Sequence, residues 1–133
     1  MLKLEIVTPE KRVIDETVES VTVPTATGEA GILTSHAPLI SALKPGILSY
    51  SNKGVTAKLA VSGGFVEVSG DQVSVMTDTA ETADEIDVEA ARAMRADAEK
   101  ALAAAASASI EETETIREQF DAANARLTLA AGR

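Results

Sequence analysis

Glycine and proline are distributed very unevenly along the chain, and this distribution limits what each part can fold into. All four prolines lie in the first 45 residues, and neither glycine nor proline occurs between Asp71 and Ala131. Alanine has the opposite bias, with 8 copies in residues 1–86 and 16 in residues 87–133. Glycine and proline interrupt regular structure, whereas alanine is the best helix former. We therefore predict a turn-rich domain over 1–86 and a helical domain over 87–133.

The first segment alternates between apolar and polar residues with the period of a β-strand. Leu2, Leu4 and Ile6 share one face, and the same alternation returns around residues 21–23, 57–61, 66–68 and 73–75. Turn-forming pairs such as Pro45-Gly46 and Gly63-Gly64 separate these stretches at short intervals. Short, evenly spaced alternating strands are typical of an antiparallel β-sandwich or flattened barrel. The sequence therefore predicts that architecture for residues 1–86.

The second segment has helical spacing. Asp87 can cap a first helix, and Ser109 with Glu112 has the spacing that begins a second one. On the second helix, one apolar seam follows a repeat of three and four residues: Thr113, Ile116, Phe120, Ala123, Leu127 and Ala130. We predict an antiparallel two-helix hairpin. Small seam residues bury little area, so we expect this hairpin to be weakly held and able to open.

Composition excludes several classes of function. The net charge is −9, from 12 basic and 21 acidic residues, and only three residues are aromatic. Nucleic-acid binding needs clustered cations, and single strands also need stacking platforms, so we expect no nucleic-acid partner. Without cysteine and with a single histidine, no metal site is expected. The longest apolar tract, residues 101–106, is too short to span a bilayer, so we expect a soluble intracellular chain.

A catalytic site is also not expected. Ser35 and His36 are adjacent, and neighbouring residues of a strand point to opposite faces, so they cannot form a dyad. An enzyme using Glu29 with this pair is therefore disfavoured. The segment from Gly28 to Gly31 lacks the Gly-Lys-Ser/Thr of a phosphate-binding loop. From the residues alone, the chain is a non-catalytic β module that carries a mobile helical hairpin.

Residues 23–48 contain three motifs in close succession: Gly28-Glu29-x-Gly31, residues 36–39 (His-Ala-Pro-Leu) and Lys44-Pro45-Gly46. With these motifs the stretch closely resembles the epsilon subunit of F-type ATP synthases. Residues 61–68 and 73–87 match in turn, so that the similarity covers essentially the whole chain in order. In this family an N-terminal β-sandwich is followed by a C-terminal two-helix hairpin. The resemblance thus implies the same division that composition and periodicity indicate.

What the resemblance implies about function is a non-catalytic rotor subunit in the central stalk, of the bacterial type. The family's sandwich docks on the gamma subunit and the c ring, and helps couple proton transport to ATP synthesis. The positions that match the region facing the c ring are Gly28, Glu29, Gly31 and His36. Glycines at 28 and 31 would alternatively only shape a tight connection. The implied location is the cytoplasmic face of the plasma membrane, with membrane association only through the complex.

For the hairpin, the resemblance implies a regulatory role. In its extended form the family's hairpin contacts the alpha and beta catalytic subunits and inhibits ATP hydrolysis. Here the second helix carries five acidic residues against Arg117, Arg126 and Arg133, and like charges oppose binding to an acidic beta segment. Some members bind ATP as a regulatory ligand, although no cofactor is required. The family's nucleotide motif is incomplete here, and its nearest matches are Glu89, Arg92 and Arg126.

Two further interpretations stay open at this point. The chain could be a free-standing binding module whose hairpin dimerises through Ile116, Phe120 and Leu127. Glu89 and Arg92, three residues apart, would equally form a simple ion pair on one helix face. Association with the gamma and catalytic subunits separates the rotor subunit from the free-standing module.

Overall fold

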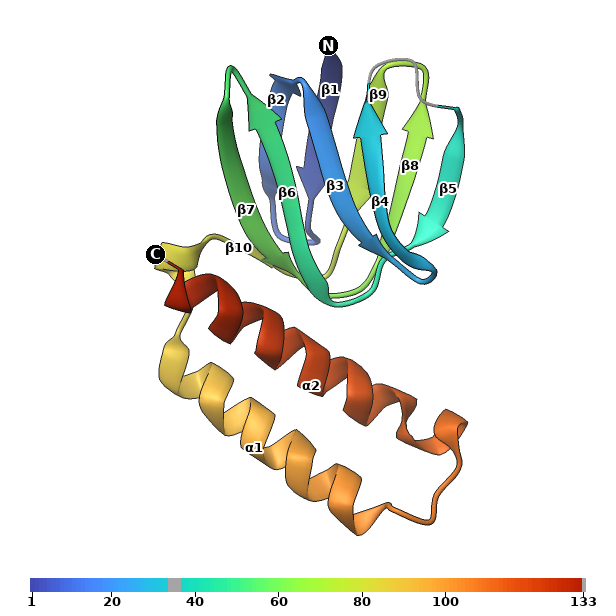
Figure 1. Cartoon of the computed structure of the whole chain (residues 1–133), viewed down its shortest axis with the longest axis vertical. Helices are drawn as coiled ribbons and strands as arrows, with labels where there is room; N and C mark the ends of the chain where they lie inside the picture. Colours follow the sequence, from blue (N-terminus) through green and yellow to red (C-terminus); the bar gives the residue numbers. More distant parts are fainter. Residues whose placement is uncertain (34–36, 133) are drawn as a thin grey trace.

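A computed structural model of the chain describes residues 1–33 and 37–132, and all structural statements below concern these residues. Two five-stranded sheets are followed by two helices (Figure 1). The first sheet has the order β2–β1–β9–β8–β5, with bounds Arg12–Val18, Leu2–Val7, Gln72–Met76, Phe65–Ser69 and Leu39–Ala42. The second has the order β10–β7–β6–β3–β4, with bounds Ala80–Glu81, Val55–Val61, Gly46–Asn52, Ser20–Thr25 and Gly28–Leu33. The predicted β-sandwich followed by a helical hairpin is confirmed.

Strand pairing is antiparallel except at one place, where β1 runs parallel to β9 with Leu4 opposite Val73. A parallel pair cannot be joined by a tight turn and needs a long crossover connection. Here that connection includes four of the five strands of the second sheet, β3, β4, β6 and β7; the fifth, β10, follows β9. β1 therefore lies inside the first sheet, although it is the first strand in the chain.

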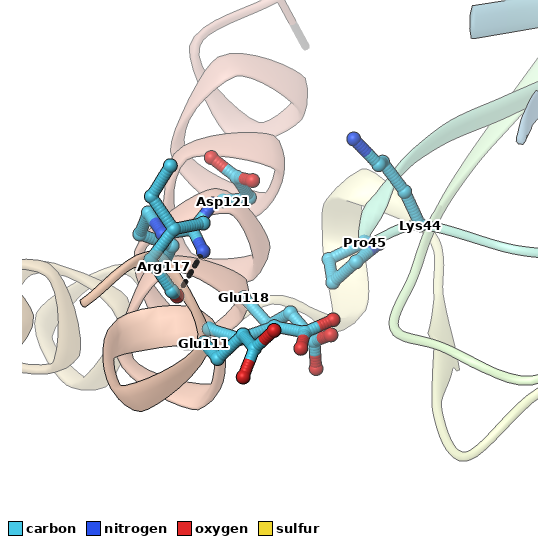
Figure 2. A pocket seen from close by; sticks show the side chains of 8 residues that line it. Lys44, Pro45, Glu111, Arg117, Glu118 and Asp121 are labelled. Carbon is cyan, nitrogen blue, oxygen red and sulfur yellow. Dashed lines mark hydrogen bonds between the residues drawn. The ribbon is translucent and has the colours of Figure 1, made fainter. Parts of the chain in front are cut away.

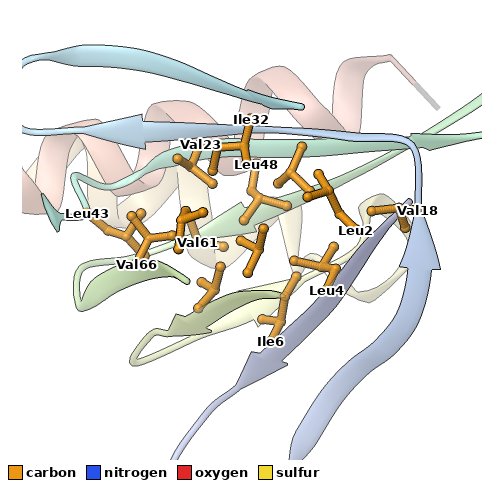
Figure 3. Packing of buried hydrophobic residues seen from close by; sticks show 14 of the residues in the cluster. Leu2, Leu4, Ile6, Val18, Val23, Ile32, Leu43, Leu48, Val61 and Val66 are labelled. Atoms are coloured by element: carbon orange, nitrogen blue, oxygen red, sulfur yellow. The ribbon is translucent and has the colours of Figure 1, made fainter. Parts of the chain in front are cut away.

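Alternation along the strands fills the space between the two sheets with aliphatic side chains (Figure 3). Leu2, Leu4 and Ile6 of β1 are fully buried, as the period-2 pattern predicts. The core cluster contains fifteen buried residues: Leu2, Leu4, Ile6, Val18, Val21, Val23, Ile32, Leu43, Leu48, Leu59, Val61, Val66, Val68, Val73 and Val75. Leucine, isoleucine and valine fill the core without an aromatic residue, which is why a chain with three aromatics can still form a sandwich.

Both predicted helix starts are confirmed. Helix α1 (Val88–Ala104) is capped by Asp87, which accepts a hydrogen bond from the Ala90 N–H at 3.0 Å. Helix α2 (Ile110–Ala131) is capped by Ser109, which accepts from the Glu112 N–H at 3.2 Å. A short 3₁₀ turn (η1, Ala83–Glu85), which the sequence analysis did not predict, connects β10 to α1.

Helix α2 has a second buried face in addition to the predicted seam. Thr113, Ala123 and Ala130 of the seam are buried, while Ile116, Phe120 and Leu127 are half-buried. Beyond the seam, Ala125 and Leu129 pack with Ala130 against the sandwich, in a cluster with Ala60 of β7 and Ile86 of the connection. The one apolar seam predicted for α2 is therefore only part of its buried surface. Consecutive apolar positions near its C-terminus widen the stripe so that it faces both α1 and the sandwich.

Figure 1 shows the consequence for the shape of the molecule: the C-terminal end of α2 meets the sandwich, and its N-terminal half slopes away from it. The helix contacts β6, β7 and η1. The hairpin is thus held at one end and open at the other.

Candidate interaction surfaces

Gly28, Glu29 and Gly31 lie on strand β4 and not in a tight connection between strands. This strand forms one edge of the second sheet, where Glu29 pairs with Pro24 and Gly31 with Thr22 of β3. All three are exposed, whereas Ile32, the residue after Gly31, is fully buried. A strand held by its neighbour presents these residues on a rigid surface, which suits a contact site better than a mobile loop does.

The two glycines of this strand differ in what the fold requires of them. Gly28 has a φ of +120°, a conformation that side chains other than glycine's rarely adopt. Gly31 has no such φ, and a Cβ built on it would meet nothing within 4 Å. The fold therefore explains Gly28 by its turn geometry but does not need glycine at position 31. A bare backbone at an exposed sheet edge leaves room for a partner to approach closely.

The fourth residue of this predicted surface, His36, lies outside the described residues, as does Ser35. Leu33, the last residue described before them, ends β4 at the opposite end from Gly28. The involvement of His36 stays a prediction.

The outer face of the first sheet carries an exposed apolar row that the sequence analysis missed. Val7, Met76, Phe65 and Ala42 lie side by side on β1, β9, β8 and β5, because strand register pairs each with the next. Met76 is 46% exposed and Phe65 is 41% exposed. Beside them is a hollow of about 320 Å³ lined mainly by apolar atoms. An apolar row on the outside of a well-packed sheet is typical of a protein–protein contact surface.

Gly64 fixes the position of Phe65 in this row. Its φ is +103°, and a Cβ there would lie 1.9 Å from the Met76 carbonyl oxygen. Glycine is therefore obligatory, because the backbones of β8 and β9 approach closely at this point. The sequence gives one indication of the row: Phe65 alternates with the inward Val66 and Val68, so it must point to the outer face of the sheet. The alignment with Met76 and Val7 depends on register, which period-2 patterns do not provide.

Of the nucleotide candidates, Glu89 and Arg92 pair with each other on α1. Arg92 Nη1 lies 2.9 Å from Glu89 Oε1, and the two side chains are 62% and 84% exposed. This is the simple ion pair that the spacing also allowed. Arg92 borders a hollow of about 420 Å³ between α1 and the end of α2, together with Arg95 and Leu127.

Arg126, the third candidate, borders a different hollow, of about 250 Å³, between α2 and the sandwich. Its Nε lies 2.7 Å from Glu81 Oε1 of β10, and its Nη1 lies 3.6 Å from the Met94 sulfur of α1. Ionisable groups lining this hollow are two cations, Lys11 and Arg126, and four carboxylates, Glu10, Asp78, Glu81 and Glu85. Excess negative charge repels a triphosphate, so these residues do not fit ATP well. The structure brings neither Glu89 nor Arg92 to Arg126 in one hollow.

The open half of α2 presents acidic side chains to the sandwich. Glu111, Glu114, Glu118 and Asp121 line a gap of about 270 Å³ whose other wall is Lys44 and Pro45. Figure 2 shows Glu111 and Glu118 projecting into the space between α2 and Pro45. The nearby Arg117 turns back along its own helix, where its Nη2 donates to the Ile110 carbonyl at 2.6 Å. Within the described part of the chain, Lys44 is thus the one cation lining this gap besides Arg117.

Among the described residues, no helix is long and apolar enough to cross a membrane, and no cluster of three metal-ligating side chains occurs.

Comparison with known proteins agrees with the resemblance. Residues 1–83 match the sequence model of a family described as "ATP synthase, Delta/Epsilon chain, beta-sandwich domain". Two solved mitochondrial ATP synthases contain chains with a similar fold. One is from Euglena gracilis (TM-score 0.77, 24% identity, 99% of this chain and 81% of the other), and one is from Tetrahymena thermophila (TM-score 0.55, 19% identity, 69% and 70%).

Curated bacterial relatives are much closer in sequence. The ATP synthase epsilon chain of Desulforamulus reducens is 52% identical over 100 residues, which cover 75% of this chain and 76% of the relative. That of Geotalea uraniireducens is 50% identical over 101 residues (76% and 73%). The epsilon chain of Desulfitobacterium hafniense is 41% identical over 126 residues, or 95% of this chain and 86% of the relative. Matches of this identity and coverage show that the chain belongs to the family of ATP synthase epsilon chains.

Proposed function

We propose that the chain is a non-catalytic central-stalk subunit that couples proton transport to ATP synthesis as part of the rotor. Family membership supports this function, and the observation that carries it is the apolar row of Val7, Met76, Phe65 and Ala42. Aliphatic side chains already fill the inner face of this sheet, so the row on its outer face is left for a partner. Large exposed apolar residues on a rigid sheet mark a lasting contact.

The proposed partner on this row is the gamma subunit, and the proposed partner on β4 is the c ring. The two surfaces lie on different sheets, so one sandwich can contact both at once. Gly31 supports the second contact, since its lack of a side chain is not required by the fold. Glu29 adds a charge at the same exposed edge. The solved chain of similar fold from Euglena gracilis belongs to an assembly described as containing F1 and the c-ring.

The hairpin is proposed to regulate ATP hydrolysis, by contacting the alpha and beta subunits when it is extended. Its anchoring at one end by a small cluster supports such a movement. The charges argue against a strong clamp: extension would expose the four carboxylates of the open half of α2 to the partner, while Arg117 is bound to its own helix. We therefore expect weak inhibition, because like charges oppose binding to an acidic partner.

The proposed location is the cytoplasmic face of the bacterial plasma membrane, where the chain is held through the rest of the complex. ATP as a regulatory ligand stays a prediction, and the carboxylates around Arg126 weigh against it. Titration of the full chain with ATP in a calorimeter tests this directly, and Arg92→Ala should abolish any heat that is observed.

The surface through which a free-standing module would dimerise is already used within the chain. Ile116, Phe120 and Leu127 are half-buried within the chain's own hairpin, whose helices pack along their length. A dimer through the same residues would first have to separate α1 from α2.

Co-purification from membranes tests the proposed function. The tagged chain, expressed in place of the native one, should recover the gamma and catalytic subunits in fixed proportion. Recovery of the chain alone, or only as a homodimer, would overturn the proposal. Comparison of ATP hydrolysis by complexes with the full chain and with a chain ending at Ile86 tests the hairpin separately. Equal rates would remove the inhibitory role and leave the rotor function intact.

A further inference from the structure

We infer that the ion pair between Arg126 and Glu81 is a latch that holds the hairpin on the sandwich, and that breaking it releases the hairpin while both parts stay folded. Within residues 1–33 and 37–132, it is the one ion pair that joins a helix of the hairpin to a strand. The inference concerns the chain by itself and does not depend on the proposed rotor function.

Geometry and burial distinguish this pair from the other ion pairs. Arg126 Nε lies 2.7 Å from Glu81 Oε1, and the two side chains are only 24% and 28% exposed. The pairs along α1, Glu89 with Arg92 and Arg95 with Glu99, are far more exposed and stay within one helix. Solvent screens an exposed pair strongly and a half-buried pair much less. The Arg126–Glu81 pair is therefore the one that can stabilise docking appreciably.

Arg126 also connects the two interfaces of α2. Its guanidinium contacts Met94 of α1 at 3.6 Å while its Nε reaches Glu81 of β10. α1 thus supports the side chain in the position that pairs with Glu81. Formation of the latch requires that α1 is packed on α2 and that α2 is docked on the sandwich, so the two contacts are coupled.

The surroundings of the pair keep the cost of release low. In the docked state Glu81 Oε1 is buried and makes no hydrogen bond, so its contact with Arg126 is an ion pair alone. Both residues line the hollow of about 250 Å³, so water in it can reach each charge once the pair separates. Rupture of a fully buried pair would leave a charge stranded in an apolar site, whereas rupture here does not. Glu81 also faces a hollow that contains Lys11, a second cation.

The rest of the docking contact is small. Three of the five buried members of its apolar cluster are alanines, and three more apolar residues are half-buried against it. The buried members are Ala60, Ile86, Ala125, Leu129 and Ala130, and the half-buried ones are Ile47, Ala83 and Val88. Alanine buries little area, and the open half of α2 adds carboxylates rather than apolar contacts. A single half-buried ion pair is therefore a large part of what holds the hairpin in place.

The chain contains no cysteine, so two introduced cysteines can be spin-labelled without interference. Lys58→Cys on β7 and Gln119→Cys on α2 are both at exposed positions, one on the sandwich and one on the hairpin. Electron-spin distance measurement on the full chain should give one narrow distribution. Glu81→Gln and Arg126→Met, which remove one charge each while keeping most of the volume, should each raise the undocked fraction about tenfold, the effect expected for losing a charge-assisted contact.

The matched control is Arg92→Met, which breaks the exposed pair on α1 and should leave the distribution unchanged. Fluorescence of Tyr50, the one tyrosine of the chain, verifies that the sandwich of each variant is folded. Raising the salt concentration should increase the undocked fraction of the unmodified chain but not that of Glu81→Gln. A narrow distribution in both Glu81→Gln and Arg126→Met, equal to that of the unmodified chain, would overturn the inference.

Discussion

The sandwich and the hairpin are stabilised by very different amounts of buried apolar surface. The sandwich core joins fifteen buried residues, all leucine, isoleucine or valine, whereas the cluster under α2 joins five, of which three are alanine. Hydrophobic stabilisation grows with the apolar area removed from water. The comparison teaches that one chain of 133 residues combines a well-packed body with an appendage that is held by a much smaller buried surface.

The largest loss of stability is expected from a substitution in the sandwich core. Leu48 is fully buried at the centre of the core, and Leu48→Ala should lower the free energy of unfolding by about 2–5 kcal/mol. Urea unfolding followed by Tyr50 fluorescence measures the change, because Tyr50 lies on β6 beside the core. A loss below about 1 kcal/mol would mean that the core is loosely packed, which the burial contradicts.

Two glycines within the rigid body should respond in opposite ways. Gly64→Ala places a Cβ against the Met76 carbonyl oxygen at a φ of +103°, and should cost about 2–3 kcal/mol of stability. The Cβ that Gly31→Ala introduces has no atom within 4 Å. This substitution should stabilise the strand slightly, by about 0.5 kcal/mol, because alanine loses less backbone entropy than glycine on folding.

Gly31→Ala also tests the proposed c-ring contact. If the bare backbone at this edge serves a partner, assembly with the c ring should weaken although the isolated chain is no less stable. If the Gly31→Ala chain assembles with the c ring as well as the unmodified chain does, position 31 makes no contact with that partner.

The sequence predicted the inward faces of the strands and the two helix caps, because period 2 and capping patterns are local. It did not predict the apolar row, because Val7, Met76 and Phe65 come together only through strand register. The second face of α2 was missed for a similar reason: Leu129 and Ala125 gain their partners only when the helix crosses β6 and β7. Among the predicted site residues, Glu29 and Gly31 lie at the exposed edge strand β4, and their contact with a partner stays a prediction. The pairing of Arg126 with Glu81 depends on tertiary structure, so the sequence could not predict it.

A substitution at the docking cluster should have a smaller effect than one in the core. Leu129 contributes most of the large apolar surface of α2 to this cluster, and Leu129→Ala should weaken docking by about 1–2 kcal/mol. The unfolding midpoint from Tyr50 fluorescence should hardly change, while the helical circular dichroism should be lost at lower urea. Equal shifts of both signals would show that the hairpin and the sandwich unfold as one unit.

The smallest effect is expected at the connection between the two parts. The Thr82 N–H donates to Glu85 Oε1 at 3.0 Å, and this bond lowers the pKa of Glu85 below its ordinary value of 4.5. A lowered pKa stabilises the fold above pH 4.5, and this stabilisation is lost as the pH falls through the folded-state pKa.

Glu85→Gln should therefore cost less than about 1 kcal/mol at pH 7, as expected for an exposed cap, and less at pH 3 than at pH 7. Urea unfolding of both chains at the two pH values checks this. A difference that persists undiminished at pH 3 would rule out the carboxylate as its source.

The most direct test of the account is the affinity of the full chain for the gamma subunit when the apolar row is altered. Phe65→Ser removes an aromatic side chain that is 41% exposed at the centre of the row, and should raise the dissociation constant at least about tenfold without unfolding the sandwich. Val55→Ser is the matched control, since Val55 is 70% exposed on the other sheet and should bind normally. Equal affinity of Phe65→Ser and the unmodified chain would contradict the proposed docking face.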